Sequence, residues 1–260
     1  MNTGDTTFIL FCSTLVFFMT PGLAFFYGGL VRRKNVLNTM MSSLFIMGLS
    51  SALWILVGYS LSFSGDHGHI IGDFTNAFLR GIGMNDLSQY SETIPALVFV
   101  GFQMMFAIIT PALITGSVAG RMRFKALFIF ILLWLFVVYY PLAHMVWGKG
   151  GFLGEVLGSV DFAGGNVVHI SSGVSGLVLS LLLGSRRGYK KQAYATHNIP
   201  FIILGATILW FGWFGFNAGS ALAANGLAAH AFMTTGTSAA FALLSWMAVD
   251  VIVTGKPTVI

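Results

Sequence analysis

Long apolar runs alternate with short polar segments along the whole chain. Each run has about twenty residues or more, the length that a helix needs to cross the hydrocarbon core of a bilayer. The runs lie near residues 7–31, 38–62, 94–118, 125–147, 162–184, 199–222 and 228–252. The pattern predicts an all-α membrane protein, a polytopic helical bundle of about seven transmembrane helices that forms a single domain over residues 1–260.

Positive charge is concentrated in the polar segments that follow the first, third, fifth and seventh runs. Only 8% of the residues are charged, and the basic ones in these segments are Arg32, Arg33, Lys34, Arg121, Arg123, Lys125, Arg186, Arg187, Lys190, Lys191 and Lys256. Short loops rich in Lys and Arg remain on the cytoplasmic side of a membrane. We therefore expect a multi-pass protein of the cell (inner) membrane, in contact with lipid, with the N-terminus outside and the C-terminus in the cytoplasm. Because topology accounts for the net charge of +5, no nucleic-acid partner is indicated.

Residue types that commonly hold metals are few. Cys12 is the single cysteine, so the chain has neither a disulfide framework nor a thiolate metal site. His67 and His69 lie in the long polar segment 63–93, where two solvated histidines are more often incidental than ligands. We expect neither a metal nor a cofactor.

A stripe of aromatic and weakly polar side chains interrupts the sixth run. On a helix at about 100° per residue, four residues of the segment GWFGFNAGSA fall within roughly one 100° arc. These are Trp213, Phe216, Asn217 and Ser220. Aromatic faces attract a cation and a hydroxyl can accept a hydrogen bond from it. The stripe therefore indicates one wall of a passage for a small cation.

His169 lies inside the fifth run and shares its helical face with Ser172, Gly173 and Gly176. Small residues of this kind mark a face that packs against protein. An ionisable group at membrane depth is by default a functional candidate, because a buried imidazole can carry or relay a proton near neutral pH. The alternative is a core histidine that is hydrogen-bonded to a neighbouring carbonyl.

Asp161 opens the same run, eight residues before His169. A regular helix would separate their backbones by about 12 Å, so the two cannot form a directly bonded acid/base pair. Asp161 is either a helix cap or an outer anchor for cations. Because no nucleophile lies beside a base, we do not expect an enzyme.

Three further aromatic residues have two interpretations each. Phe102 and Phe106 are one helical turn apart in FQMMFAII; Phe106 could meet Phe216 in a hydrophobic constriction, or the pair could be core packing. Trp147, near the outer end of the fourth run, is either an interfacial belt residue or an indole face that attracts an arriving cation.

Several segments together resemble the ammonium transporter family (Amt/Mep/Rh), especially its bacterial Amt branch, over the N-terminal two thirds of such a protein. The segments, in the family's order, are MTPGLAFFYGGLVRRKNVLNTM, FQMMFAIITPALITGSVAGRMRF, PLAHMVWGKG, DFAGGNVVHISSGVSGLV and NIPFIILGATILWFGWFGFNAGSA. The resemblance implies the first five-helix repeat plus two helices of the inverted second repeat.

The resemblance also implies a role for each candidate residue. Phe106, Trp147 and Ser220 would recruit NH4⁺ at the outer side, and Phe106 with Phe216 would form a twin phenyl gate. Asp161 would be a structural acid below this site. His169 would be the first of two pore histidines and Trp213 a wall of the conduction path. Ammonium would lose its proton and cross as ammonia through a hydrophobic, histidine-lined pore.

The same resemblance implies a homotrimer and engagement of a PII-type regulatory protein on the cytoplasmic face. The alternatives are an ammonium sensor that signals to a cytoplasmic partner, or a non-conducting truncated fragment. Since the second pore histidine of the family lies beyond the seventh span, we expect residues 1–260 to be a fragment of a longer reading frame.

Overall fold

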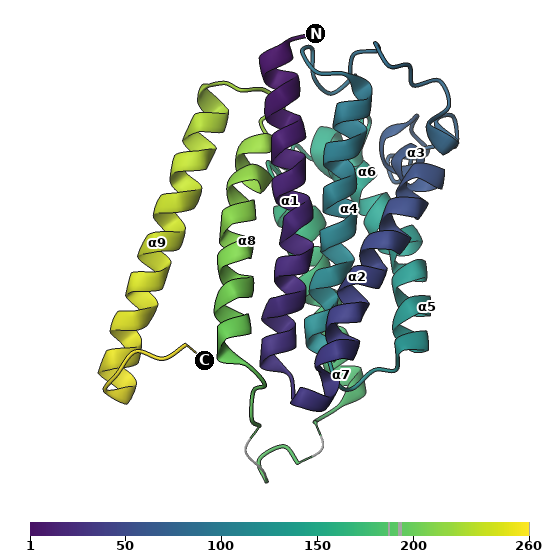
Figure 1. Cartoon of the computed structure of the whole chain (residues 1–260). Helices are drawn as coiled ribbons and strands as arrows, with labels where there is room; N and C mark the ends of the chain where they lie inside the picture. Colours follow the sequence, from purple (N-terminus) through teal and green to yellow (C-terminus); the bar gives the residue numbers. More distant parts are fainter. Residues whose placement is uncertain (187, 192–193, 260) are drawn as a thin grey trace.

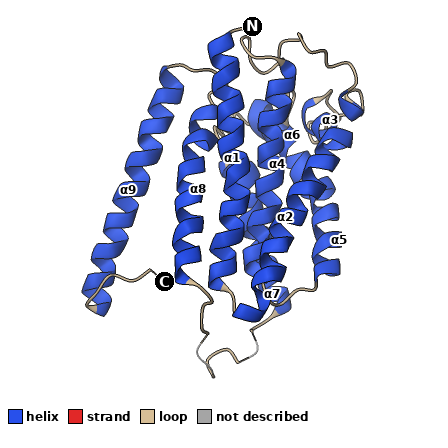
Figure 2. Cartoon of the chain, in the orientation of Figure 1, coloured by secondary structure: helices blue, strands red, loops and turns tan. Residues whose placement is uncertain are grey.

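Seven helical spans are long and apolar enough to cross a membrane, as the sequence predicted (Figure 1). The computed structural model describes residues 1–186, 188–191 and 194–259, so Arg187 lies outside the described residues. In this part of the chain every regular element is a helix (Figure 2). The spans are Thr3–Leu30, Arg33–Phe63, Ala96–Val118, Phe124–Val156, Gly165–Leu183, Ile199–Gly219 and Gly226–Thr254.

Two of the spans are composite. The second joins α2 (Val36–Leu53) to the short α3 (Tyr59–Phe63) through a π-helical turn at Trp54–Gly58. The fourth joins α5 (Phe124–Trp134) to α6 (Tyr140–Trp147) through a π-helical turn at Leu135–Tyr139. The two breaks face each other, because a Cβ on Gly58 would lie 2.6 Å from the ring of Tyr140. The absence of a side chain at Gly58 therefore lets α3 and α6 approach closely.

The fourth span also ends later than predicted. After a break at residues 148–151, a helical turn at Phe152–Val156 extends it beyond the expected end at residue 147. The expected end at residue 147 was based on hydropathy alone. Glycines at 148, 150 and 151 interrupt the apolar pattern, so nothing in the sequence indicated the helical turn that follows. This break directly follows Trp147 and sets the direction of the chain at the outer end of α6.

α4 (Ala96–Val118) forms the centre of the bundle and packs against α1 (Thr3–Leu30), α2 and α7 (Ser171–Leu183). Most of its side chains are buried. The indole Nε1 of Trp54, from the second span, donates to the carbonyl oxygen of Val100 at 3.1 Å. Cys12 on α1 is a buried free thiol.

α8 (Ile199–Gly219) lies along α1, and glycines make the contact possible. Cβ atoms added to Gly22 on α1 or to Gly205 and Gly212 on α8 would overlap atoms of the partner helix. Small residues let transmembrane backbones approach closely enough for van der Waals attraction to hold them. α9 (Gly226–Thr254) packs against α8 and stands at the edge of the bundle in Figure 1. Its outer surface exposes large apolar side chains such as Phe241 and Trp246.

The two ends of the bundle differ in charge. The segment between α3 and α4 is a loop with one short 3₁₀ turn at Ala77–Leu79, and it lies at the same end as the N-terminus (Figure 1). Arg32, Arg121 and Arg186 come together at the other end, around a hollow of about 530 Å³. Basic residues that are far apart in sequence therefore gather at the end opposite to the N-terminus.

Candidate functional site

A small cavity, which we call the outer cavity, lies at the ends of α4, α6 and α8 on the side of the bundle that carries the N-terminus (Figure 1). Its volume is about 150 Å³, and its lining residues are Phe63, Tyr90, Phe99, Phe102, Gln103, Phe106, Trp147, Asp161, Phe162, Ser220 and Leu222. Three of the residues that the sequence suggested for an outer site, Phe106, Trp147 and Ser220, thus line one cavity. Aromatic rings form most of the wall, and their negative faces attract cations.

Ser220 supplies a hydroxyl at this cavity. It follows the last residue of α8, and its Oγ donates to the carbonyl oxygen of Phe216 at 2.8 Å. Because the single hydroxyl proton is used in that bond, the oxygen can act only as an acceptor toward the cavity. The arrangement suits a ligand that donates hydrogen bonds.

Phe106 lines the cavity, and Phe216 packs against it from α8. Their ring centroids are 4.6 Å apart, and Phe106 also contacts Trp147 edge to face with centroids 6.0 Å apart. Both phenyl side chains are 1% exposed. Phe102 contacts Phe106 as well, with centroids 4.9 Å apart. The phenyl pair therefore separates the cavity from the region below by an apolar layer.

His169 and Trp213 lie on the far side of this layer. The imidazole stacks on the indole of Trp213 with ring centroids 5.5 Å apart and an angle of 15° between planes, and its centroid is 5.8 Å from that of Phe216. His169 thus lies beside two aromatic residues of the α8 stripe, Trp213 and Phe216. Among the described residues the ring of His169 has no hydrogen-bond partner, and only its backbone carbonyl oxygen accepts a bond, from Ser172. His169 is therefore not a core histidine bonded to a neighbouring carbonyl, which was the alternative.

The prediction that His169 is buried by protein packing was wrong. Its residue is exposed, and its helical face borders an open groove of about 420 Å³ that Ser172, Gly173 and Gly176 also line. A Cβ on Gly173 would meet nothing within 4 Å, whereas one on Gly176 would contact Ser117. Small residues permit close packing but do not say which segment supplies the partner.

Asp161 is a helix cap rather than the first residue of a regular helix. The helix begins at Gly165, after Gly164 with a φ of 109°, so the assumed regular helix from residue 161 to His169 was wrong. The four amide N–H groups of residues 164–167 donate to the carboxylate at 2.6–3.1 Å. The carbonyl oxygen of Asp161 also accepts from the indole Nε1 of Trp147 at 2.8 Å. Asp161 therefore fixes both the start of this helix and the orientation of Trp147.

Asn217 departs from the predicted stripe. Its Nδ2 donates to Oγ1 of Thr235 on α9 at 2.8 Å, on the side away from the outer cavity. An arc of 100° is wide enough for its edges to face different neighbours, which explains the error. Sequence reasoning also missed Gln103 and Tyr90 in the cavity lining. Gln103 is the one amide side chain in α4, and this could have marked it as a candidate for the cavity. The sequence around Tyr90 contains no comparable pattern.

Comparison with known proteins gives the same answer for family and fold. The sequence matches the family model of the Ammonium Transporter Family over residues 7–260. It is 50% identical over 260 residues to an ammonium transporter of Bacillus subtilis, covering 100% of this chain and 63% of that protein. It is 47% identical over 276 residues to an ammonium transporter of Mycobacterium tuberculosis, covering 98% of this chain and 58% of that protein.

A solved structure has the same arrangement of helices. The crystal structure of Candida albicans Mep2 superposes with a TM-score of 0.90 at 35% identity, covering 100% of this chain and 57% of that chain. This chain thus spans 58–63% of the length of the two curated relatives named above. With the family model matched from residue 7 to residue 260, the chain belongs to the ammonium transporter family.

Proposed function

We propose that this chain takes part in the transport of ammonium across the membrane. The observation that carries the proposal is one column of groups: an aromatic cavity with a hydroxyl acceptor, a phenyl pair beneath it, and an imidazole below the phenyls. The names of the curated relatives, which are ammonium transporters, support the same activity. They favour transport over sensing as the role of this chain.

In this proposal NH4⁺ is recruited in the outer cavity by Phe106, Trp147 and Ser220. The aromatic faces attract its charge, and the Ser220 oxygen accepts one of its N–H groups. NH4⁺ and K⁺ are similar in size, so a size filter would discriminate poorly between them. The Ser220 acceptor favours the ion that donates hydrogen bonds, because K⁺ has no proton to offer.

Phe106 and Phe216 act as the gate. Their rings touch, so a molecule passes only when at least one side chain rotates. An ion would lose its hydration in this apolar layer at a large cost in free energy, whereas neutral ammonia would cross at a much smaller cost. The gate therefore favours passage as neutral ammonia, with the proton given up by NH4⁺ accepted by the imidazole of His169. K⁺ has no neutral form and is excluded from this route.

His169 and Trp213 line the path below the gate. The stacked indole limits the orientations of the imidazole, whose two nitrogens are left without protein partners among the described residues. A neutral imidazole has one N–H donor and one acceptor nitrogen, so it can receive and pass on a proton or hydrogen-bond to ammonia. Asp161 is a structural acid in this scheme.

The arrangement in the membrane is also proposed. Basic residues at the end opposite to the N-terminus support a cytoplasmic location of that end in the cell (inner) membrane. From the family resemblance we infer a homotrimer and contact with a PII-type regulatory protein at the basic end. The exposed apolar side chains of α9 and the open groove beside His169 would be covered by lipid or by further protein.

The test is a current measurement on the intact protein reconstituted into liposomes. Pulses of ammonium and of potassium are applied at equal concentration, and uptake of methylammonium is measured in parallel. We expect a response to ammonium and none to potassium. Equal responses to the two ions would overturn the proposal.

A further inference from the structure

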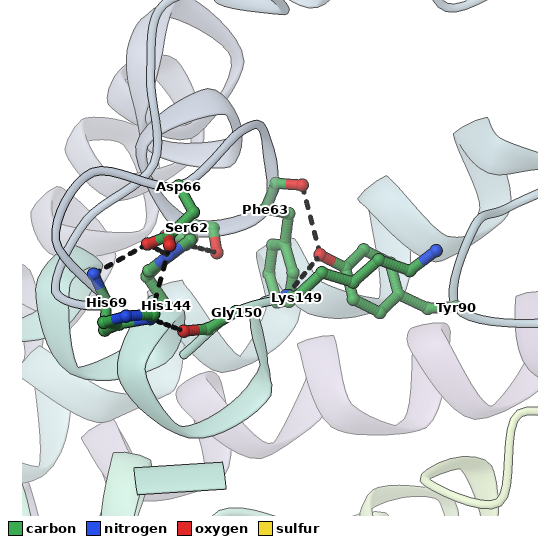
Figure 3. Close-up of polar contacts among 8 residues, drawn as sticks. All are labelled: Ser62, Phe63, Asp66, His69, Tyr90, His144, Lys149 and Gly150. Atoms are coloured by element: carbon green, nitrogen blue, oxygen red, sulfur yellow. Dashed lines mark hydrogen bonds and ion pairs between the residues drawn. The ribbon is translucent and has the colours of Figure 1, made fainter. Parts of the chain in front are cut away.

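A polar cluster outside the candidate transport path joins the loop after α3 to the outer end of α6 (Figure 3). Its centre is His144, whose residue is 0% exposed. The Nε2 atom of His144 lies 3.1 Å from Oδ1 of Asp66, and its Nδ1 atom lies 3.2 Å from the carbonyl oxygen of Ser62. The two contacts join segments 78 to 82 residues apart in sequence.

The number of protons on this ring follows from its partners. A carbonyl oxygen only accepts, so Nδ1 must carry a proton to bond Ser62. An ionised carboxylate also only accepts, so Nε2 must carry a second proton to bond Asp66. A ring with protons on both nitrogens is an imidazolium cation. The alternatives are two neutral rings: one that accepts at Nε2 from a protonated Asp66, and one with its proton on Nε2 and no bond from Nδ1 to Ser62.

The surroundings of Asp66 favour the ionised carboxylate. Its Oδ1 also accepts from the backbone N–H of His69 at 2.8 Å, and its side chain is 28% exposed. The hydrogen bond from His144 lowers the pKa of Asp66 below its usual value, with further lowering by the backbone bond from His69. An ionised Asp66 can only accept at its oxygens, so the contact at 3.1 Å requires a proton on Nε2 of the buried ring.

The other charged groups near the cluster do not replace His144 as the cationic partner of Asp66. The ring Nδ1 of His69 lies 3.4 Å from Oδ2 of Asp66, but this side chain is 54% exposed and its Nδ1 also lies 2.6 Å from the carbonyl oxygen of Gly150. Lys149 extends away from His144, and its Nζ lies 5.9 Å from the centre of the Tyr90 ring (Figure 3). His144 is therefore the one fully buried partner of Asp66 in this cluster.

The cluster also fixes the turn that follows Trp147. Gly148 N–H donates to the carbonyl oxygen of His144 at 2.8 Å, and a Cβ on Gly148 would lie 2.6 Å from Nδ1 of His144. The N–H of Phe152 donates to the carbonyl oxygen of His69 at 2.9 Å. The loop that carries Asp66 thus contacts the chain both before and after Trp147.

We propose that His144 is a buried imidazolium whose ion pair with Asp66 positions Trp147 at the mouth of the transport path. The positioning role rests on the function proposed for Trp147, whereas the charge of His144 does not. His144 is a positioning residue, because it touches neither the outer cavity nor the phenyl pair among the contacts described. The pair requires the ionised carboxylate, so it is lost in acid when Asp66 is protonated.

The charge is tested by ¹⁵N NMR of the intact protein with labelled histidine at neutral pH. We expect the ring of His144, assigned by its loss in His144→Gln, to show two protonated nitrogens. In Asp66→Asn the ring should show one protonated and one bare nitrogen. A bare nitrogen on His144 in the unchanged protein would overturn the proposal, since the ring would then be neutral. His67→Gln is the matched control, because His67 is exposed in the same loop, and it should leave the His144 signals unchanged.

The positioning role is tested by the indole N–H resonance of Trp147 and by transport in the same samples. Asp66→Asn and His144→Gln should shift this resonance and raise the half-saturating ammonium concentration several-fold, with the maximal rate retained. Their double variant should be no worse than the more severe single one, because each change breaks the same pair. An unmoved indole resonance in Asp66→Asn would refute positioning. If His144 is doubly protonated in a protein that transports no ammonium, the proposed function fails and the assignment of charge stands.

Discussion

The indole of Trp213 lies almost parallel to the imidazole of His169, with 5.5 Å between ring centroids and 15° between the planes. One ring comes from α8 and the other from the π-helical turn Gly165–Ile170 that precedes α7. The contact restricts rotation of the imidazole without using either nitrogen. A histidine held in this way keeps both nitrogens available for a passing molecule.

His169→Ala should separate the transport of ammonia from the movement of protons. If the imidazole relays the proton, we expect the ammonium current to fall by about 100-fold, the usual lower range for the loss of a general acid–base group. The measurement compares current with methylammonium uptake in reconstituted protein. His230→Ala is the control, since His230 is exposed on α9. Unchanged current and intact potassium exclusion in His169→Ala would remove this residue from the path.

Ser220→Ala should weaken the capture of ammonium at low concentration. A hydrogen bond to a charged group contributes about 1.5–3 kcal/mol, so the half-saturating concentration should rise about 10- to 100-fold. Uptake of labelled methylammonium over a concentration series checks this. Ser245→Ala is matched chemically, because its hydroxyl also donates to the carbonyl four residues earlier, at an exposed position on α9. Similar curves for the two variants would exclude Ser220 as an acceptor.

Substitutions of Trp147 should distinguish its aromatic face from its N–H group. Trp147→Leu removes both, and we expect a loss of roughly 2- to 30-fold in apparent affinity from the cation–π contribution. Trp147→Phe keeps an aromatic face but loses the bond from Nε1 to the carbonyl oxygen of Asp161. Its affinity should therefore lie between those of Trp147→Leu and the unchanged protein. If Trp147→Leu transports normally at low ammonium, Trp147 is only an interfacial aromatic residue.

Gly205→Ala should destabilise the bundle. The added Cβ would overlap the backbone of Phe26 on α1, and overpacking of this kind costs about 1–3 kcal/mol. Thermal unfolding in detergent should show a lower midpoint. At Gly48 on α2 a Cβ would meet nothing within 4 Å, so Gly48→Ala should leave the midpoint unchanged or raise it through the higher helix propensity of alanine. Equal midpoints for both variants would show that α1 and α8 can separate without cost.

Acid should weaken the attachment of the outer loop. The pKa of Asp66 is lowered in the folded protein, chiefly by the hydrogen bond from His144. Its contribution to stability is therefore fully present above the unfolded pKa of about 3.9 and is lost as the pH falls through the lower folded pKa. In Asp66→Asn this acid-dependent part of the unfolding curve should be absent. Glu92→Gln, at an exposed carboxylate, should retain it, and a retained acid dependence in Asp66→Asn would contradict the assignment.

Hydropathy alone was enough to predict the seven spans, because a bilayer requires continuous apolar helices of fixed length. The same periodicity placed Phe216 and Ser220 on one side of α8, where Phe216 contacts Phe106 and Ser220 lines the cavity. It failed for Asn217, which bonds Thr235, since a position at the edge of a stripe can turn to either neighbouring helix. Helical periodicity gives the faces of a helix but does not assign a partner to each face.

The features that the sequence did not predict depend on contacts between distant segments. The pair of Asp66 and His144 joins residues 78 positions apart, and neither residue has a local pattern that marks it. The break after Trp147 depends on the loop packed against it. The exposure of His169 was also missed, because burial depends on which segments surround a helix. The resemblance to the family supplied the roles of individual residues, which spacing could not.

The four amide bonds to Asp161 have a consequence for how long an ion stays at the outer cavity. A bare carboxylate there would bind any arriving cation, potassium included, and release it slowly. With its oxygens occupied by the backbone of residues 164–167, Asp161 can make the local potential more negative without coordinating the ion. Such a site draws cations from dilute solution and still lets them leave quickly, which rapid turnover requires.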